Sequence, residues 1–142
     1  MTSIASKSYV LFPLGEQRFA LPAESVTELA RQDQLHTFPH RTPLLSGVLM
    51  RRGRVIPVCD VAQVLVGPDA PARKFYLLAS YRAERQQELM AIPVTSECEL
   101  ANAVAHPPVD GSPAYIRGTL PLGEETISIV DLEALLAREV LG

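Results

Sequence analysis

The sequence has little that would mark a metal-binding, nucleic-acid-binding or membrane protein. Its 142 residues include two cysteines, which form no CxxC pair, and no histidine cluster at ligand spacing, so zinc and thiol-redox motifs find no support. No stretch approaches the ~20 apolar residues of a membrane span. The net charge of −3 provides no basic face for nucleic acid and no lysine-rich run for anionic lipid. We therefore predict no nucleic-acid partner and no direct membrane insertion.

Catalytic motifs are also missing. The serines lack a GxSxG context, and no GxxxxGK[ST] or GxGxxG phosphate-binding loop is present. His36, His40 and His106 lie in proline-rich loops without the i, i+4 pairing of a helical metal site, so a hydrolase using His36 or His40 is an alternative that no motif supports. Asp60 and Asp131 start equivalent helices, which explains them as caps rather than as an acid-base pair. The sequence predicts no enzyme activity, no catalytic residue, no cofactor and no metal.

An internal repeat is the main feature that the sequence does contain. Residues 47–65 align with residues 118–136 without a gap at a shift of 71, half the chain's length, and the same shift holds upstream. The aligned identities include Ala20 with Ala91, Pro22 with Pro93, Gly47 with Gly118, Leu49 with Leu120, Ile56 with Ile127 and Asp60 with Asp131. Such a tandem pair predicts a pseudo-symmetric protein whose useful surface lies at or between the two units.

Each copy is predicted to contain about five short strands and one helix. The first copy has a hairpin at residues 9–14 and 18–22, a strand at 26–30, a loop at 32–43, a hairpin at 47–50 and 54–59, and a helix at 60–66. In that helix Asp60 is expected to cap the first turn, with Gln63 bonding back to it. The second copy repeats this plan with strands at 75–81, 89–94 and near Leu100, a proline loop at 106–113, a hairpin at Gly123 and a longer helix from Asp131. Five antiparallel strands close economically into a barrel, so we expect an all-β fold of two small packed barrels with short helices and a C-terminal helix.

The chain length fits a single domain, residues 1–142. Within it we expect subdomains at about 9–66 and 74–142, joined by the turn-rich linker 67–73, and we leave open an exchange of strands between the barrels.

One charged surface stands out among the candidate sites. Arg51 and Arg52 occupy the tip of an otherwise apolar hairpin, where a guanidinium held by rigid strands can fork onto a partner's carboxylate. A solvated hairpin tip explains them equally well. Glu28 is the natural counter-charge, and its spacing from Val26 on a strand predicts that both point to one face. Without further information, Val26 and Glu28 are best interpreted as part of an ordinary strand in which one position is half-exposed.

The segments YVLFPLGEQRFALPAESVTELA and GVLMRRGRVIPVCDV, with the prolines of TFPHRTP, closely resemble the CheW-like family of bacterial chemotaxis coupling proteins. The resemblance covers nearly the whole chain, and its most specific part runs from Gly47 to Asp60. It implies two five-stranded SH3-like barrels around a shared apolar core. It also implies a cytoplasmic adaptor that joins the cytoplasmic tip of chemoreceptors in membrane arrays to the regulatory domain of a CheA-type histidine kinase.

The resemblance also implies binding residues. By position, the family's receptor-linked valine and glutamate fall on Val26 and Glu28, its hairpin glycine on Gly47, and its Arg-Gly arginine on Arg52. Arg51 stands where the family usually has leucine, which predicts a more basic groove, and IPVTSECEL at 92–100 departs from a Val-Asp-x-Val pattern. Two alternatives stay open: a ligand- or peptide-sensing module with the inter-barrel groove as pocket, and a coupler in a related pathway such as twitching motility.

Overall fold

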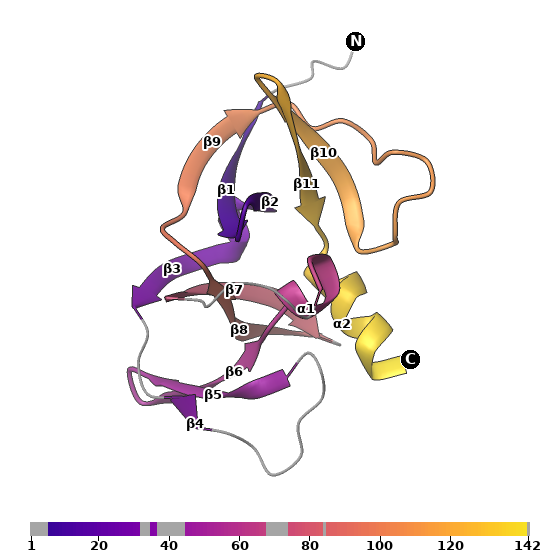
Figure 1. Cartoon of the computed structure of the whole chain (residues 1–142). Coiled ribbons are helices and arrows are strands. Elements are labelled where there is room, and N and C mark those ends of the chain that lie inside the picture. Colours follow the sequence, from indigo (N-terminus) through magenta and orange to yellow (C-terminus); the bar gives the residue numbers. More distant parts are fainter. Residues whose placement is uncertain (1–5, 32–34, 37–44, 68–73, 84, 142) are drawn as a thin grey trace.

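Two β-barrels stack on one another, with two helices along one side of their junction (Figure 1). This is a computed structural model, and it describes residues 6–31, 35–36, 45–67, 74–83 and 85–141. The upper barrel of Figure 1 has the strand order β10-β11-β2-β1-β9, and the lower barrel has the order β3-β7-β8-β6-β5-β4. The predicted β fold with short helices and a C-terminal helix is confirmed, with the two-residue β4 as an addition to the five strands expected in the lower barrel.

The strand bounds follow the predicted hairpins closely. The upper barrel contains β1 (Lys7–Leu14), β2 (Gln17–Pro22), β9 (Glu99–Ala103), β10 (Ile116–Leu122) and β11 (Glu125–Val130). The lower barrel contains β3 (Val26–Arg31), β4 (Leu35–His36), β5 (Leu45–Arg51), β6 (Arg54–Cys59), β7 (Phe75–Ala83) and β8 (Gln86–Val94). A short 3₁₀ turn, η1 (Ala23–Ser25), connects β2 to β3, and the helices are α1 (Ala62–Leu65) and α2 (Leu132–Leu141). Of the expected linker 67–73, Gly67 alone belongs to the described residues, and His40 lies outside them.

Each barrel takes strands from both halves of the sequence. β1 and β2 join β9, β10 and β11, whereas β7 and β8 join β3 to β6. The two crossings are parallel pairs, in which Val58 lies opposite Ala91 and Ile129 lies opposite Ala20. The repeat shift of 71 maps Val58 onto Ile129 and Ala20 onto Ala91, so the two pairs are equivalent. The duplicated units are therefore related by a pseudo-two-fold axis and exchange their first hairpins.

Strands near the junction bury side chains on both faces, which explains their nearly continuous apolar runs. The upper interior contains Tyr9, Leu11, Ala20, Leu120, Ile127 and Ile129. The lower interior contains Ala91, Leu49, Ile56 and Val58, which the shift of 71 relates to Ala20, Leu120, Ile127 and Ile129, together with Tyr76, Leu78 and Ala30. Tyr76 and Leu78 lie opposite Pro93 and Ala91 on β8, as Tyr9 and Leu11 lie opposite Pro22 and Ala20 on β2, so they take the matching places on β7. The intervening residues of the same strands, among them Phe12, Leu21, Leu77 and Ile92, form a larger core between the barrels. This is the shared apolar core that the family resemblance implied.

A tight backbone contact closes the upper barrel. His106, just after β9, forms an isolated bridge with Thr119 of β10, with N···O distances of 2.8 and 2.9 Å. The neighbouring Gly118 is buried, and a Cβ atom there would lie 2.7 Å from the carbonyl oxygen of His106. The lower barrel has the corresponding pairing between β4 and β5, where His36 lies opposite Val48. In both barrels the repeated glycine, Gly47 or Gly118, follows a register shift at the start of its strand.

The two equivalent aspartates behave differently at the helix starts. The carboxylate of Asp131 accepts a hydrogen bond from the Ala134 N–H at 3.1 Å, which is the expected cap of α2. At α1, Val61 is the N-cap residue and has no side-chain cap bond, and the backbone carbonyl of Asp60 accepts the Gln63 N–H at 3.1 Å. The predicted Asp60 cap is therefore wrong. The helix begins at Ala62 and its N-cap lies one residue later than expected, so Asp60 is outside the cap position. The residue lies in the interior and is 6% exposed.

Candidate functional site

The β5–β6 hairpin presents its arginines through a tight two-residue turn. Arg52 and Gly53 both have left-handed φ values, 51° and 76°, as a type I′ turn requires. Arg51 and Arg54 lie opposite each other at the ends of the strands. The Arg52 side chain is 76% exposed, which confirms the predicted exposed tip.

Glu28 on β3 faces this tip and forms ion pairs with it. Its Oε2 accepts a hydrogen bond from Arg51 Nη2 at 2.9 Å and lies 3.7 Å from Arg52 Nη2. The hydrogen bond from Arg51 lowers the pKa of Glu28 below its usual 4.5, and the charges of Arg51 and Arg52 act in the same direction. Although β3 and β5 are not neighbours in the sheet order, this contact ties them together. Glu28, which the sequence analysis named as the counter-charge, thus forms ion pairs with both arginines, and Arg51 lies closer to it than Arg52 does.

The expected common face of Val26 and Glu28 does not follow from strand alternation. The register against β7 shifts between these two residues, from Val26 opposite Ala79 to Glu28 opposite Leu78. Thr27 is the extra residue, so the period of two is broken there. Both residues nevertheless line one groove.

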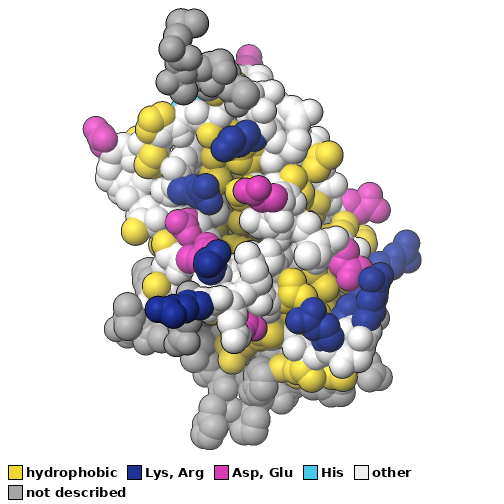
Figure 2. Space-filling model, turned by 180° about the vertical axis from the view of Figure 1, so that it is seen from behind, with side chains coloured by type: hydrophobic (Ala, Val, Ile, Leu, Met, Phe, Trp, Pro, Cys, Tyr) yellow, Lys and Arg dark blue, Asp and Glu magenta, His cyan; other side chains and the backbone are white. Residues whose placement is uncertain are grey.

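The groove runs between the two barrels and is mainly apolar. It has a volume of about 210 Å³ and is lined from β3 and β7 of the lower barrel and from β1, β9 and the segment before β9 in the upper barrel. Its lining residues are Val10, Val26, Glu28, Leu29, Leu77, Cys98, Glu99 and Leu100. Leu29 and Leu100 are exposed at 36% and 72%, whereas Val10 and Leu77 are buried. The rear face of the molecule shows Lys and Arg side chains gathered at its lower right, close to hydrophobic ones (Figure 2).

A second charged cluster, not anticipated from the sequence, lies at the upper-barrel end of this groove. The Arg18 guanidinium on β2 donates to Glu125 on β11 at 2.6 and 3.3 Å and to Glu99 on β9 at 3.2 Å. The hydrogen bond from Arg18 lowers the pKa of Glu125, and the bond to Glu125 raises that of Arg18. The repeat could have indicated Glu99 as a site residue, because Glu99 in the second copy is equivalent to Glu28 in the first.

Gly47, the fifth predicted binding residue, is buried in β5, four positions before the arginines. It lies opposite Val58, as Gly118 lies opposite Ile129. The structure therefore brings Val26 and Glu28 to the groove and Arg51 and Arg52 to its edge, whereas Gly47 sits at the barrel closure.

Neither thiol is poised for reaction. Cys59 is 6% exposed, and desolvation raises its pKa to about 11. Desolvation also raises the pKa of Cys98, which lines the groove, to about 12. Within the described ranges, no three His, Cys, Asp or Glu side chains are grouped closely enough to hold a metal ion.

Comparisons with known proteins agree with this architecture. A family model described as "CheW-like domain" matches residues 8–140. The chain belongs to the CheW-like family. Among curated proteins, the probable chemotaxis protein CheW of Rhizobium etli is 24% identical over 93% of this chain and 88% of its own length. Protein FrzA of Myxococcus xanthus is 25% identical over 92% of this chain and 85% of its own length.

A solved structure shows the same fold. The scaffolding protein TtCheW of Thermoanaerobacter tengcongensis superposes with a TM-score of 0.76 at 20% identity, covering 89% of this chain and 85% of that one. The predicted pair of SH3-like barrels is thereby confirmed. In the part of the chain that the structure describes, no helix has the length and apolarity needed to span a bilayer.

Family membership settles the function at a general level. The protein is a coupling adaptor of chemotaxis or of a related chemosensory pathway, and it interacts with signalling proteins of that pathway.

Proposed function

We propose that the protein couples the cytoplasmic tip of chemoreceptors to the regulatory domain of a CheA-type histidine kinase, in the cytoplasm and without catalysing a reaction. It reaches membrane receptor arrays through protein contacts alone. The observation that carries this proposal is the apolar groove between the barrels, with the ion-paired Glu28 at its edge.

The groove suits an apolar helix end of a receptor. Leu29 and Leu100 expose apolar surface on its two sides, and burying such surface is worth roughly 25 cal/mol per Å². Val26 and Glu28 would contact the receptor segment directly. Arg52 is exposed and can fork onto a receptor carboxylate, while Arg51 holds Glu28 in place. Charges placed at the rim in this way fix register and speed association more than they add affinity.

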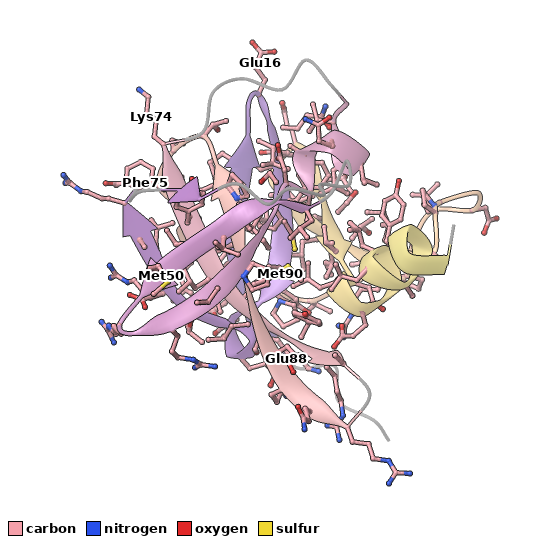
Figure 3. All side chains as sticks on the ribbon, turned by 90° about the horizontal axis from the view of Figure 1, so that it is seen from below. Glu16, Met50, Lys74, Phe75, Glu88 and Met90 are labelled. Carbon is pink, nitrogen blue, oxygen red and sulfur yellow. The ribbon has the colours of Figure 1, made fainter. Side chains whose placement is uncertain are left out.

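The kinase needs a separate surface, and the outer face of the β5–β6 hairpin offers one. Met50 and Val55 lie opposite each other there and are 47% and 62% exposed. Figure 3 shows Met50 on the outside of the molecule, in contrast to Met90 near its centre, which is fully buried. An exposed apolar pair on a rigid hairpin is a fitting anchor for a second folded domain.

Binding assays with receptor cytoplasmic fragments and the kinase regulatory domain of the same organism test both contacts. We expect Arg52→Glu to weaken receptor binding about tenfold or more and to reduce kinase activation, because it places a carboxylate beside Glu28. Val55→Glu should weaken kinase binding and leave receptor binding intact. Arg117→Glu is the matched control, since Arg117 is exposed on β10 and lines a different cavity. Failure to recover either partner, with no effect of Arg52→Glu on kinase activation, would refute the proposal.

A sensing module on the same barrels is the weaker candidate. The groove volume of about 210 Å³ falls below the range of roughly 300–1,000 Å³ that is usual for small-molecule pockets. A rise in melting temperature with small ligands, absent with the partner proteins, would favour the sensor instead.

A further inference from the structure

The groove lies on the pseudo-two-fold axis, because its opposite walls are built from equivalent residues. Leu29 on β3 lies opposite Leu77 on β7, and Leu100 on β9 lies opposite Val10 on β1. Directly opposed residues of antiparallel strands share a face, so each pair forms one apolar wall. The repeat shift of 71 converts Leu29 into Leu100, and the β1 and β7 strands take matching places in their barrels.

An apolar segment would therefore meet nearly the same walls in either of two opposite directions. Since the hydrophobic effect is not directional, these walls alone leave the direction of a bound segment undetermined. Glu28 and Glu99 are likewise equivalent, and each lines the groove at its own barrel.

The partners of these two glutamates break the symmetry. Among the described residues, Glu28 faces two guanidinium groups, those of Arg51 at 2.9 Å and Arg52 at 3.7 Å. At the upper barrel the ratio of guanidinium groups to carboxylates is reversed, because the guanidinium of Arg18 pairs with two carboxylates, Glu125 at 2.6 Å and Glu99 at 3.2 Å. The cause is local, since the position equivalent to Arg51 is Leu122 and the position equivalent to Arg18 is Leu89.

Exposure adds to this difference. The Arg52 side chain, on the lower-barrel side of the groove, is 76% exposed, and the Glu99 side chain, on the upper-barrel side, is 70% exposed. A segment that crosses the groove from one barrel to the other would thus find an accessible cation on the lower-barrel side and an accessible carboxylate on the upper-barrel side.

We propose that this charge asymmetry sets the direction in which the receptor segment lies in the groove. The bound partner is an amphipathic helix whose C-terminal, carboxylate-bearing end lies at Arg52, and whose N-terminal, basic end lies at Glu99. A helix carries partial positive charge at its N-terminus and partial negative charge at its C-terminus, so its own dipole favours the same direction. This inference rests on the proposed function and adds a direction to it.

Paramagnetic labelling tests the direction without requiring a structure of the complex. A receptor cytoplasmic fragment of the same organism is spin-labelled at either end of its apolar helix and added to the ¹⁵N-labelled protein. The C-terminal label should broaden amide signals around Glu28 and Arg52, and the N-terminal label should broaden those around Glu99 and Glu125. Equal broadening of both regions by each label, or the reverse pattern, would overturn the direction and leave the coupling function standing. Absence of binding would refute both.

A charge exchange provides the second test. In the double variant Arg52→Glu, Glu99→Arg, the accessible charges trade places, so the two labels should exchange their broadening patterns or broaden both regions. The single variant Glu99→Gln, which changes no shape, should weaken the preference and cost less than tenfold in affinity. Arg117→Glu should preserve the original pattern, since it leaves both ends of the groove unchanged. An unaltered pattern in the double variant would show that charge does not set the direction.

Discussion

At Gly118, space rather than backbone conformation demands glycine. An added Cβ atom would lie 2.7 Å from the His106 carbonyl oxygen, which itself accepts the Thr119 N–H in the bridge that closes the upper barrel. Backbone on both sides of this contact leaves little room to move. Gly47 repeats this residue at the equivalent position of the lower barrel, so the resemblance-based assignment of Gly47 to partner binding has a structural alternative.

We expect Gly118→Ala to lower the free energy of unfolding by about 1–3 kcal/mol, as overpacking of a tight site does. Urea denaturation followed by circular dichroism measures the change. Gly123→Asn is the control, because Gly123 has a left-handed φ of 62° with nothing within 4 Å, and asparagine tolerates that conformation. A Gly118→Ala protein as stable as the wild type would contradict the proposed role of this contact.

The Glu28 ion pair should make stability depend on pH. Because the pKa of Glu28 is lowered in the folded protein, its contribution is present above its usual value of 4.5 and is lost as the pH falls through the folded value. At pH 7 we expect Glu28→Gln to cost about 0.5–1 kcal/mol, as for a half-exposed ion pair. The difference between wild type and variant should shrink toward zero as the pH falls below 4.5 and through the lowered pKa of Glu28 in parallel unfolding curves, and it should also shrink at high salt. A difference that stays constant with pH would show that the carboxylate charge is not responsible.

At the scale of elements, the two copies differ in the length of their first hairpin. The β7–β8 hairpin is longer than β1–β2: Tyr81 lies opposite Glu88 as Leu14 lies opposite Gln17, and β7–β8 then adds two further pairs. Figure 3 shows this hairpin, with Glu88 on it, projecting from the molecule. The backbone N–H of Arg82 donates to the Glu133 carboxylate of α2 at 3.0 Å, so the extension also holds the helix.

The start of α2 gives an element-scale prediction. Asp131→Ala removes the carboxylate that accepts the Ala134 N–H, and it should reduce the free energy of unfolding by about 1 kcal/mol. Leu132 and Leu135 are buried beneath this first turn, so the loss should appear in global thermal unfolding rather than as local fraying. Asp131→Asn retains a capping oxygen and should lose only a few tenths of that amount. Equal losses for alanine and asparagine would point away from capping.

At the scale of the whole molecule, strand exchange makes the two sequence halves interdependent. The upper barrel cannot form without β1 and β2, and the lower barrel cannot form without β7 and β8. The largest core also draws residues from both halves, with Phe12 and Leu21 packed in one cluster with Leu77 and Ile92. The repeat is thus a unit of sequence, while the barrel is the unit of structure.

We therefore expect fragments 1–70 and 71–142 to be unfolded when expressed separately, with narrow amide dispersion in NMR spectra. Mixed at equimolar ratio, they should regain the dispersion of the intact chain, because the exchanged hairpins can pair between fragments. Cooperative thermal unfolding of either fragment alone would contradict this interdependence. The intact chain, carried through the same dilution and mixing steps, serves as the control.

The sequence by itself determined the features that depend on local order. The hairpins at Gly15, Gly53 and Gly123, the exposed arginine tip, and the equivalence of positions such as Leu49 and Leu120 all follow from turn chemistry, alternation and the repeat. The tertiary structure decided which strands became neighbours, and hence that Arg51 reaches Glu28 and that Arg18 joins Glu99 to Glu125. It also decided the bulge that breaks the spacing of Val26 and Glu28, and the position of the α1 N-cap at Val61. Such pairings join residues far apart in the chain, and their choice depends on how two barrels can share one core, which no local period encodes.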